Sequence, residues 1–341
     1  MTLNGIVAFV LVFGTIVLVH ELGHFLVAKA VGVMVRDFSI GFGPALVRWR
    51  RRGTYYSLRL LPLGGFVRLE GMENPAESPP ADQGEPPLAP SDPRRFTNRP
   101  MWQRVLTIAA GPAMNFVLAG VLLAYFFVPP VVQGIEPGGP AAVAGIEPGD
   151  RIVRIGDLHT PTGARVQRAV LTAPEGARLP VWIERDGRIR QVVVEVARQD
   201  GRGYIGIRMG GARPWPQALY GGFVQMVDST GDIVRIIARM LGGREPVQVA
   251  GPVGIFSMVQ EAAQQGPANL IGLAAILNIN LGLINLLPLP VLDGGWLLFM
   301  GIEWIRRRPL EPQLQSLAQM VGLMLLIGLM LLATYFDLLR G

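Results

Sequence analysis

The feature that most constrains this 341-residue chain is an uncharged apolar run that carries three polar residues at its end. No charged residue occurs from Ile6 to Val19, and His20-Glu21-Leu22-Gly23-His24 follows directly before the chain becomes apolar again. A helix places His20 and His24 one turn apart on the same face. A charged side chain at the centre of a bilayer costs about 2.5–3.5 kcal/mol even on the gentlest scales. These side chains therefore need a compensating partner.

The spacing His-Glu-x-x-His is the one with which two imidazoles hold a single Zn²⁺ and place the intervening glutamate beside it as a general base. Two alternatives are a chance match on a soluble amphipathic helix and a pair of hydrogen-bonded core histidines. The apolar surroundings argue against both, and so does the histidine count, because the motif uses two of only three histidines. We expect His20 and His24 to be metal ligands and Glu21 to be the catalytic residue.

The composition indicates a polytopic membrane protein with some soluble mass. Half of the residues are hydrophobic and only 16% are charged, which is too apolar for an ordinary soluble domain. The absence of cysteine excludes thiol catalysis and cysteine-ligated zinc. The net charge of +6 comes from arginines beside apolar spans, so it indicates topology rather than nucleic-acid binding.

Four apolar segments approach the length of a membrane span. They are roughly Ile6–Val33, Val105–Val128, Leu270–Leu287 and Leu317–Leu332. The N-terminus has no basic region and no Ala-x-Ala site, so we expect a retained first span rather than a signal peptide. Arginines concentrate between the first two spans and again at residues 306–308. The positive-inside rule then places both loops in the cytoplasm, and both termini and residues 129–269 on the other side.

The segments between the spans differ in character. Residues 38–44 and 55–72 resemble β segments with glycine kinks that are apolar enough to enter the bilayer. Residues 74–93 have the composition of a flexible surface loop. Residues 131–209 predict a compact β-rich unit with a hairpin at Asp186-Gly187. Residues 225–241 predict an interfacial amphipathic helix, or a surface helix packed on the β unit.

A carboxylate near the third span completes the candidate metal site. Asp293 follows a Pro-x-Pro stretch that should end the helix, and Gly294-Gly295 allow close backbone approach. A carboxylate there is costly unless it binds a cation, although Asp293 also suits the N-cap of the next helix. Two histidines and one aspartate leave a fourth tetrahedral position for water, as in a catalytic zinc site.

The motifs together resemble the site-2 protease family of intramembrane zinc metalloproteases, and most closely its bacterial sigma-E regulator type. They are His20–His24, Gly111-Pro-Ala-Met-Asn115 and Asn285-Leu-Leu-Pro-Leu-Pro-Val-Leu-Asp293-Gly, while Ala144–Ile152 resembles the PDZ family. The resemblance implies His20, His24 and Asp293 as zinc ligands and Glu21 as acid/base. It also implies a set of substrate contacts: Asn285, Gly41, Gly43, Gly65 and Asn115. Relatives of this type carry two tandem PDZ domains, whereas this sequence indicates one.

We therefore expect a four-helix α-helical membrane protein with a membrane-associated β region and one extracytoplasmic PDZ-like domain. The expected division is 1–128 and 269–341 for the two halves of the membrane core, 129–210 for the PDZ-like domain and 211–268 for an amphipathic connector. The PDZ-like domain would bind peptide C-termini, near residues 132–135, or only limit access to the site.

The expected function is zinc-dependent cleavage of a single-pass membrane protein, which would be an anti-sigma factor or a signal-peptide remnant after a first extracytoplasmic cut. We expect the protein to lie in the bacterial inner membrane, in contact with its lipid, and to have no nucleic-acid partner. Two alternatives are a non-catalytic PDZ-bearing receptor with a vestigial metal site and a metal transporter. The intact set of four catalytic positions opposes the first. The lack of polar residues across the other spans opposes the second.

Overall fold

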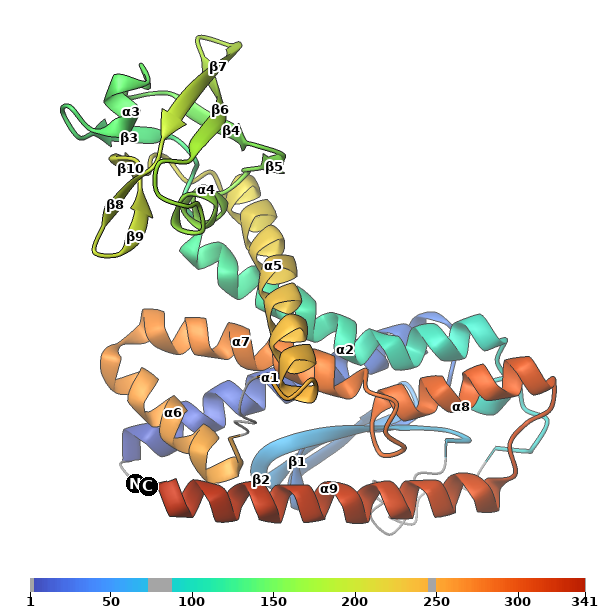
Figure 1. The fold of residues 1–341 in the computed structure, drawn as a ribbon. Helices are drawn as coiled ribbons and strands as arrows, with labels where there is room; N and C mark the ends of the chain where they lie inside the picture. Colours follow the sequence, from blue (N-terminus) through green and yellow to red (C-terminus); the bar gives the residue numbers. More distant parts are fainter. Residues whose placement is uncertain (1–2, 73–87, 245–249, 341) are drawn as a thin grey trace. The chain divides into compact units, whose positions relative to one another are not determined.

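The computed structural model describes residues 3–72, 88–244 and 250–340 (Figure 1). Two compact units form: Met1–Ala119 together with Thr230–Gly341, and Gly120–Ser229. The first unit combines the N-terminal and C-terminal parts of the chain and contains the candidate metal site. The finer four-part division expected from the sequence stays a prediction.

Among the residues that the structure describes, four helices are long and apolar enough to cross a membrane, which agrees with the predicted number of spans. They are α1 (Leu3–Ala30), α2 (Met101–Leu123), α7 (Pro267–Asn285) and α9 (Pro312–Arg340). A short 3-10 turn, η2 (Ala124–Phe126), extends α2. Because lipid offers no hydrogen bonds to the backbone, helices of this length can satisfy their own amides across the bilayer.

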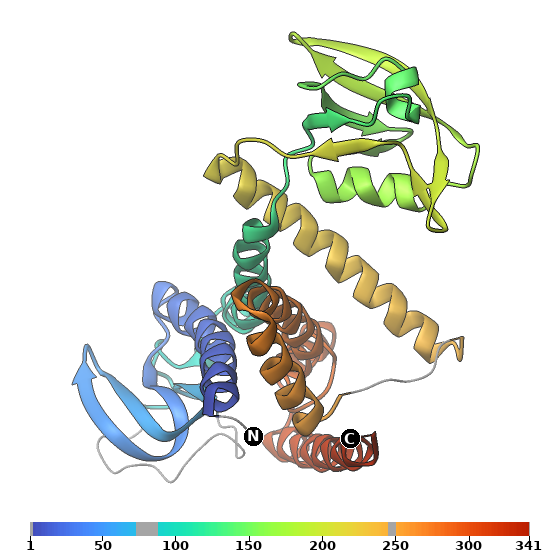
Figure 2. The same ribbon diagram turned by 90° about the vertical axis from the view of Figure 1, so that its left-hand side faces the viewer.

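The predicted β region is a long hairpin of β1 (Val35–Arg51) and β2 (Thr54–Leu69). Both strands bend, so the first half of β1 is paired on two sides: Ser39 lies opposite Phe66 and also opposite Ser57. The Ser39 and Ser57 hydroxyls are 2.6 Å apart. Gly41 supports this bend with φ +88°, and a side chain there would meet the Leu61 carbonyl. The hairpin packs beside α1 (Figure 2).

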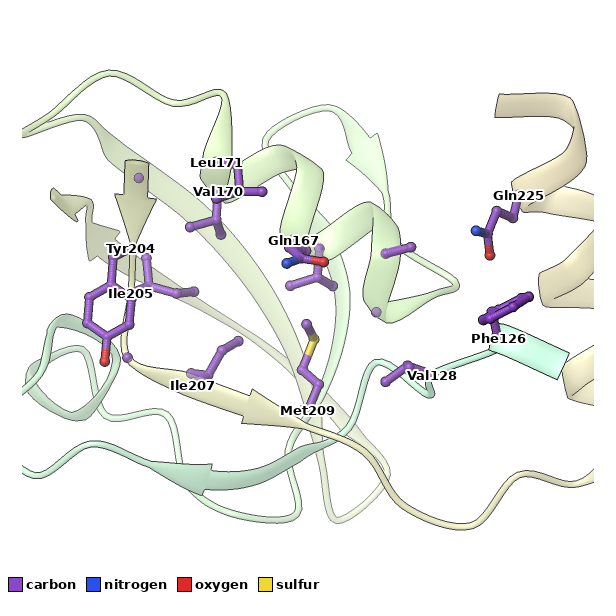
Figure 3. A pocket seen from close by; sticks show the side chains of 15 residues that line it. Phe126, Val128, Gln167, Val170, Leu171, Tyr204, Ile205, Ile207, Met209 and Gln225 are labelled. Atoms are coloured by element: carbon purple, nitrogen blue, oxygen red, sulfur yellow. The ribbon is translucent and has the colours of Figure 1, made fainter. Parts of the chain in front are cut away.

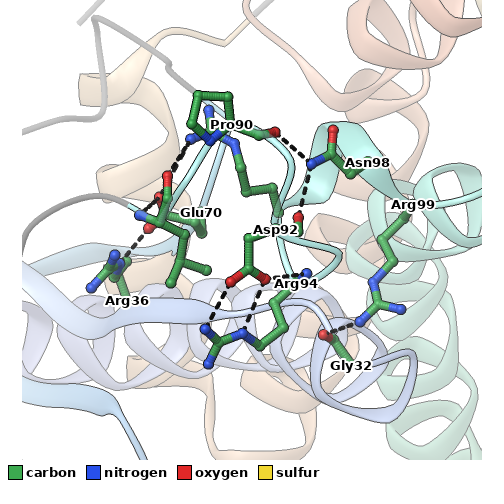
Figure 4. A network of polar contacts seen from close by, with 10 residues as sticks. Gly32, Arg36, Glu70, Pro90, Asp92, Arg94, Asn98 and Arg99 are labelled. Atoms are coloured by element: carbon green, nitrogen blue, oxygen red, sulfur yellow. Dashed lines mark hydrogen bonds and ion pairs between the residues drawn. The ribbon is translucent and has the colours of Figure 1, made fainter.

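Segment 88–99 joins the hairpin to α2 through a network of polar contacts (Figure 4). The buried Glu70 carboxylate pairs with Arg36 and accepts a hydrogen bond from the Leu88 N–H. The short helix η1 (Phe96–Asn98) follows, and Arg99 donates to the Gly32 carbonyl just after α1. These contacts fix the connection between the motif-bearing helix and α2. The expected flexible loop 74–93 lies largely outside the described residues.

Two further helices complete the first unit. Helix α6 (Pro252–Gln265) packs against α1, α7 and α9, and its first turn donates the Gly251 and Gly254 N–H groups to the Asp337 carboxylate of α9. Helix α8 (Asp293–Arg306) begins at the candidate ligand. The loop before α8 folds back on it, since an added Cβ at Gly294 would lie 2.1 Å from the Leu287 carbonyl oxygen.

The second unit is β-rich, as predicted. A four-stranded sheet runs in the order β5-β4-β6-β7, and two smaller pairs, β10-β3 and β8-β9, accompany it. The strands are β3 (Val132–Ile135), β4 (Arg151–Ile155), β5 (Leu158–His159), β6 (Arg178–Arg185), β7 (Arg188–Glu195), β8 (Ala197–Gln199), β9 (Arg202–Tyr204) and β10 (Ile207–Met209), with helices α3 (Pro140–Val143) and α4 (Gly163–Leu171). The hairpin turn at Asp186-Gly187 has two positive φ angles, as a tight type I′ turn requires.

Buried aliphatic side chains form the core of this unit. They include Val132, Ile152, Val166, Val181, Ile183 and Val194, each at most 1% exposed. The predicted amphipathic stretch belongs to a longer helix, α5 (Trp215–Leu241). Arg165 of α4 makes a two-pronged contact with Asp228 of α5, with both N–O distances 2.8 Å. The first part of α5 is therefore fixed to the β-rich unit.

Candidate metal centre

Helices α1 and α8 bring two imidazoles and one carboxylate together, although they are far apart in the sequence. His20 Nε2 and His24 Nε2 are 3.2 Å apart, and Asp293 Oδ2 lies 3.2 Å from the first and 3.4 Å from the second. Both histidines are buried, and all three are grouped as potential ligands of one metal ion. Asp293 Oδ2 is buried and accepts no hydrogen bond of good geometry from the two histidines beside it. This oxygen is therefore available to bind a metal ion.

The triangle formed by these three atoms has the dimensions of one face of a zinc coordination tetrahedron. Zinc–nitrogen bonds of about 2.0–2.1 Å place neighbouring tetrahedral ligands about 3.3 Å apart. The three measured separations fall within 0.2 Å of that value. Two imidazoles and a carboxylate are also a donor set that zinc accepts in catalytic sites, where a fourth position stays open. The residues present therefore fit a zinc ion.

Helix α2 forms the wall behind the two histidines. An added Cβ at Gly111 would lie 2.2 Å from His24 Nε2 and 2.9 Å from His20 Cε1, so only glycine fits there. One helical turn earlier, the Thr107 carbonyl is 2.8 Å from His24 Nδ1. This contact requires the proton on Nδ1 and leaves Nε2 free as a ligand. Close approach of the helices depends on Gly23, where a Cβ would meet the Ala110 carbonyl oxygen at 2.3 Å.

Asp293 is held in place by its own helix and by an ion pair further along it. It lies in the first turn of α8, where the helix dipole favours a negative charge. The N-cap position itself is Leu292, so the alternative role of Asp293 as an N-cap is not the one that the structure displays. Arg104 of α2 contacts Glu303 of α8 at 2.7 Å, and both side chains are largely buried. This pair fixes α8 against the helix that cradles the histidines.

Glu21 lies beside the β region. A Cβ added to Gly65 of β2 would come within 3.4 Å of Glu21 Cγ. Within the described residues, the 65–69 segment pairs with β1 on one side only. The half-buried Glu21 thus lies next to a strand segment whose second edge has no strand partner in the described part of the chain.

The remaining predicted site residues lie in different environments. Asn285 is half-buried at the end of α7, before the loop that leads to Asp293. Gly41 and Gly43 both have positive φ at the bend of β1, and no contact joins them to the metal ligands. Asn115 is fully buried, with Nδ2 3.3 Å from His20 Nδ1. This predicted substrate contact therefore lies beside the Nδ1 atom of a predicted metal ligand.

Several supporting residues were not predicted from the sequence. The Thr107 carbonyl carries no side-chain signal, and the Arg104–Glu303 pair joins residues nearly two hundred positions apart. The sequence indicates Gly111 only as part of a family motif and does not predict that it forms a wall of the site. Its position in the middle of an apolar helix, next to Pro112, is the signal that could have revealed it.

The second unit contains a groove of its own, about 420 Å³ in volume, between α4 and residues 203–209 (Figure 3). Val170, Leu171, Ile205, Ile207 and Met209 line its apolar part, and Gln167 and Gln225 add amides. Strand β10 on the groove's side pairs with β3, so the groove lies beside residues 203–209, next to α4. Peptide binding near residues 132–135 stays a prediction.

Apolar helices of membrane-spanning length, a buried His₂Asp centre and an adjacent glutamate define an intramembrane metalloprotease. A model of peptidase family M50 matches residues 8–329, and the chain belongs to this family. It is 37% identical to a provisionally named zinc metalloprotease of Brucella suis, over 98% of this chain and 94% of that one. It is 32% identical to the regulator of sigma-W protease RasP of Bacillus subtilis, over 100% of this chain and 99% of that one.

A further likeness concerns a solved structure, the PDZ domain of an SdrC-like protein from Listeria monocytogenes. It is 17% identical, covers 23% of this chain and 84% of that chain, and has a TM-score of 0.22. The family and the relatives make this protein a zinc-dependent intramembrane endopeptidase, as expected from the sequence.

Proposed function

We propose that the protein cleaves a peptide bond in or near the transmembrane helix of a single-pass membrane protein, with His20, His24 and Asp293 holding zinc and Glu21 acting as acid and base. The triangle of three ligand atoms, matched to a zinc tetrahedron, is the observation on which this proposal rests. Bound zinc would polarise the scissile carbonyl and make a water molecule more acidic. Glu21 takes the proton of that water and delivers it to the leaving amine.

The substrate must present an extended backbone, because a helix hides its amides in its own hydrogen bonds. Segment 65–69 lies next to Glu21 at Gly65, and the side of this segment that does not pair with β1 would offer backbone groups to such a strand. Asn285, on the loop side of the site, would hold the other side of the opened substrate. Gly41 and Gly43 would act indirectly: they allow the bend that gives the β region its shape.

The proposed topology follows the arginines. The hairpin, segment 88–99 and residues 306–308 face the cytoplasm, and the β-rich unit faces the other side of the bacterial inner membrane. The substrate would be an anti-sigma factor or a signal-peptide remnant that a first extracytoplasmic cut has already shortened.

The experiment compares Glu21→Gln with Glu261→Gln, a matched change at an exposed glutamate of α6. Each full-length protein is purified, its zinc is measured, and a single-pass model substrate is added in detergent or nanodiscs. We expect Glu21→Gln to keep zinc and lose cleavage, while Glu261→Gln keeps both. Retained cleavage by Glu21→Gln would refute the assignment of Glu21, and zinc-free wild-type protein that still cleaves would refute the metal mechanism.

For the β-rich unit we propose peptide binding in the groove between α4 and residues 203–209. Its volume of about 420 Å³ and its apolar lining suit the last side chains of an extended peptide. Gln167→Trp should fill the groove and weaken the binding of a labelled peptide with an apolar C-terminus. Gln191→Trp, at an exposed position of β7 outside the groove, is the control. If the wild-type protein and both variants fail to bind such peptides, the peptide-binding proposal is refuted. The remaining proposal for this unit is then that it limits the access of substrates to the metal site.

A further inference from the structure

Asn115 of α2 is a buried polar side chain whose hydrogen bonds are only half accounted for. Its exposure is 0%, its Nδ2 atom is 3.3 Å from His20 Nδ1, and its Oδ1 atom has no hydrogen-bond partner in the described structure. Such an oxygen is costly in an apolar environment. The expectation that Asn115 contacts substrate leaves both facts unexplained, because a fully buried amide does not reach a peptide outside the helix packing.

The other histidine shows what this position does. His24 Nδ1 lies 2.8 Å from the Thr107 carbonyl oxygen, an acceptor on the same helix, α2. A proton on Nδ1 leaves the Nε2 lone pair directed at the metal centre. His20 needs the same arrangement, because its Nε2 atom is also a corner of the ligand triangle. The group that faces His20 Nδ1 must then accept a hydrogen bond.

Asn115 meets this need with its carbonyl oxygen. Rotation of its amide by a half turn exchanges Oδ1 and Nδ2 without moving the rest of the side chain. Oδ1 then accepts the Nδ1–H of His20, and Nδ2 takes the position that has no partner in the described structure. In the opposite orientation the amide donates to Nδ1, the imidazole proton lies on Nε2, and His20 cannot bind a metal through Nε2.

We infer that Asn115 is a positioning residue, whose side-chain carbonyl fixes the His20 tautomer that offers Nε2 to zinc. The inference rests on the proposed ligand role of His20 and adds the residue that makes this role available. Helix α2 thereby orients both imidazoles, through the Thr107 carbonyl for His24 and through Asn115 for His20.

The test uses full-length protein in detergent and measures zinc affinity by competition with a chelator, together with the visible spectrum of the Co²⁺-loaded protein. Asn115→Asp keeps an acceptor toward His20, and Asn115→Leu removes it. The control is Asn278→Leu, because Asn278 is equally buried but its Nδ2 bonds to the Ala274 carbonyl within α7. We expect Asn115→Leu to bind zinc about 10–100-fold more weakly. Asn115→Asp should stay within about threefold of wild type, and so should Asn278→Leu.

The aspartate variant tests the need for an acceptor even if the leucine variant does not fold. The inference requires only a hydrogen-bond acceptor that faces His20 Nδ1, and a carboxylate supplies one. A folded Asn115→Asp protein that lost zinc or showed an altered Co²⁺ spectrum would therefore mean that an acceptor is not what this position provides. That result would overturn the inference. So would an Asn115→Leu protein with wild-type zinc affinity and a raised KM, which is the behaviour of a substrate contact. The His20→Ala variant distinguishes failure of the proposed ligand set from failure of the Asn115 inference. Wild-type zinc affinity in His20→Ala would refute the ligand set. Reduced zinc affinity in His20→Ala, together with wild-type zinc affinity in Asn115→Leu, would refute only the role of Asn115.

Discussion

Gly111→Ala is the smallest change that should disable the metal centre without touching a ligand. The added methyl group would sit 2.2 Å from His24 Nε2 and 2.5 Å from His24 Cε1. His24 would have to retreat by about 1 Å to reach ordinary contact, whereas metal–ligand distances tolerate only about 0.2 Å. Loss of a hydrogen bond behind a ligand costs about 10–100-fold in affinity. Displacement of the ligand itself should therefore weaken zinc binding by about 100-fold or more, which is about 2.7 kcal/mol.

The assay is zinc content after equilibration with a graded series of chelator concentrations, read alongside cleavage of a model transmembrane substrate. Gly301→Ala in α8 and Gly328→Ala in α9 are matched controls, because an added Cβ at either position meets nothing within 4 Å. These controls should keep zinc, and each should gain about 0.5–1 kcal/mol of helix stability. Full zinc occupancy in a folded Gly111→Ala protein, at the same chelator concentration as wild type, would refute the packing argument.

Three further changes test other parts of the fold. Glu303→Ala leaves Arg104 buried without its ion-pair partner and should lower the free energy of unfolding by about 3–5 kcal/mol, measured by thermal unfolding in detergent. The double variant Glu303→Ala/Arg104→Met should recover part of this loss, because it removes the unpaired charge. Burial raises the pKa of Asp150, but hydrogen bonds from Arg185 and the Glu147 N–H outweigh it and hold that pKa below its ordinary value. The ion pair therefore stabilises the β-rich unit above the ordinary aspartate pKa and loses this effect as the pH falls through the lowered value, so acid should increase hydrogen exchange there less in Asp150→Asn than in wild type. Asp337→Asn should cost about 1 kcal/mol by weakening the cap of α6, seen as a lower melting temperature, and an unchanged value would contradict the capping role.

The sequence predicts those parts of the site whose chemistry is local. His20, Glu21 and His24 follow from helical spacing alone, and the four spans follow from apolar length. Asp293 is marked by its cost in an apolar segment, which groups it with the histidines as a candidate ligand although most of the chain separates them. In the β-rich unit, the Asp186-Gly187 hairpin is readable because its turn chemistry is written in two adjacent residues.

What the sequence does not predict depends on packing between distant elements. The double pairing of Ser39 requires both strands of the hairpin to bend, and no period-2 pattern reports a bend. The groove beside residues 203–209 forms because β10, the last strand of the unit in the chain, pairs with β3, the first, and such long-range pairing leaves no local signal. Asn115 carries a family signal, but the positioning role inferred for it rests on its burial and its distance from His20, which the sequence does not indicate.

In the proposed metal centre, helix α2 would orient both histidines without supplying a ligand. Gly111 leaves room for both imidazoles, and Thr107 and Asn115 face the Nδ1 atoms of His24 and His20. Its Arg104 pairs with Glu303 on the helix that begins with Asp293. Because α1 and α8 are separated by most of the chain, neither could fix the three ligand atoms to within a few tenths of an ångström by itself. Substitutions on the inner face of α2 should therefore lower zinc affinity more than equal changes on α7, and a survey of both helices that found equal losses would show that the ligands position one another.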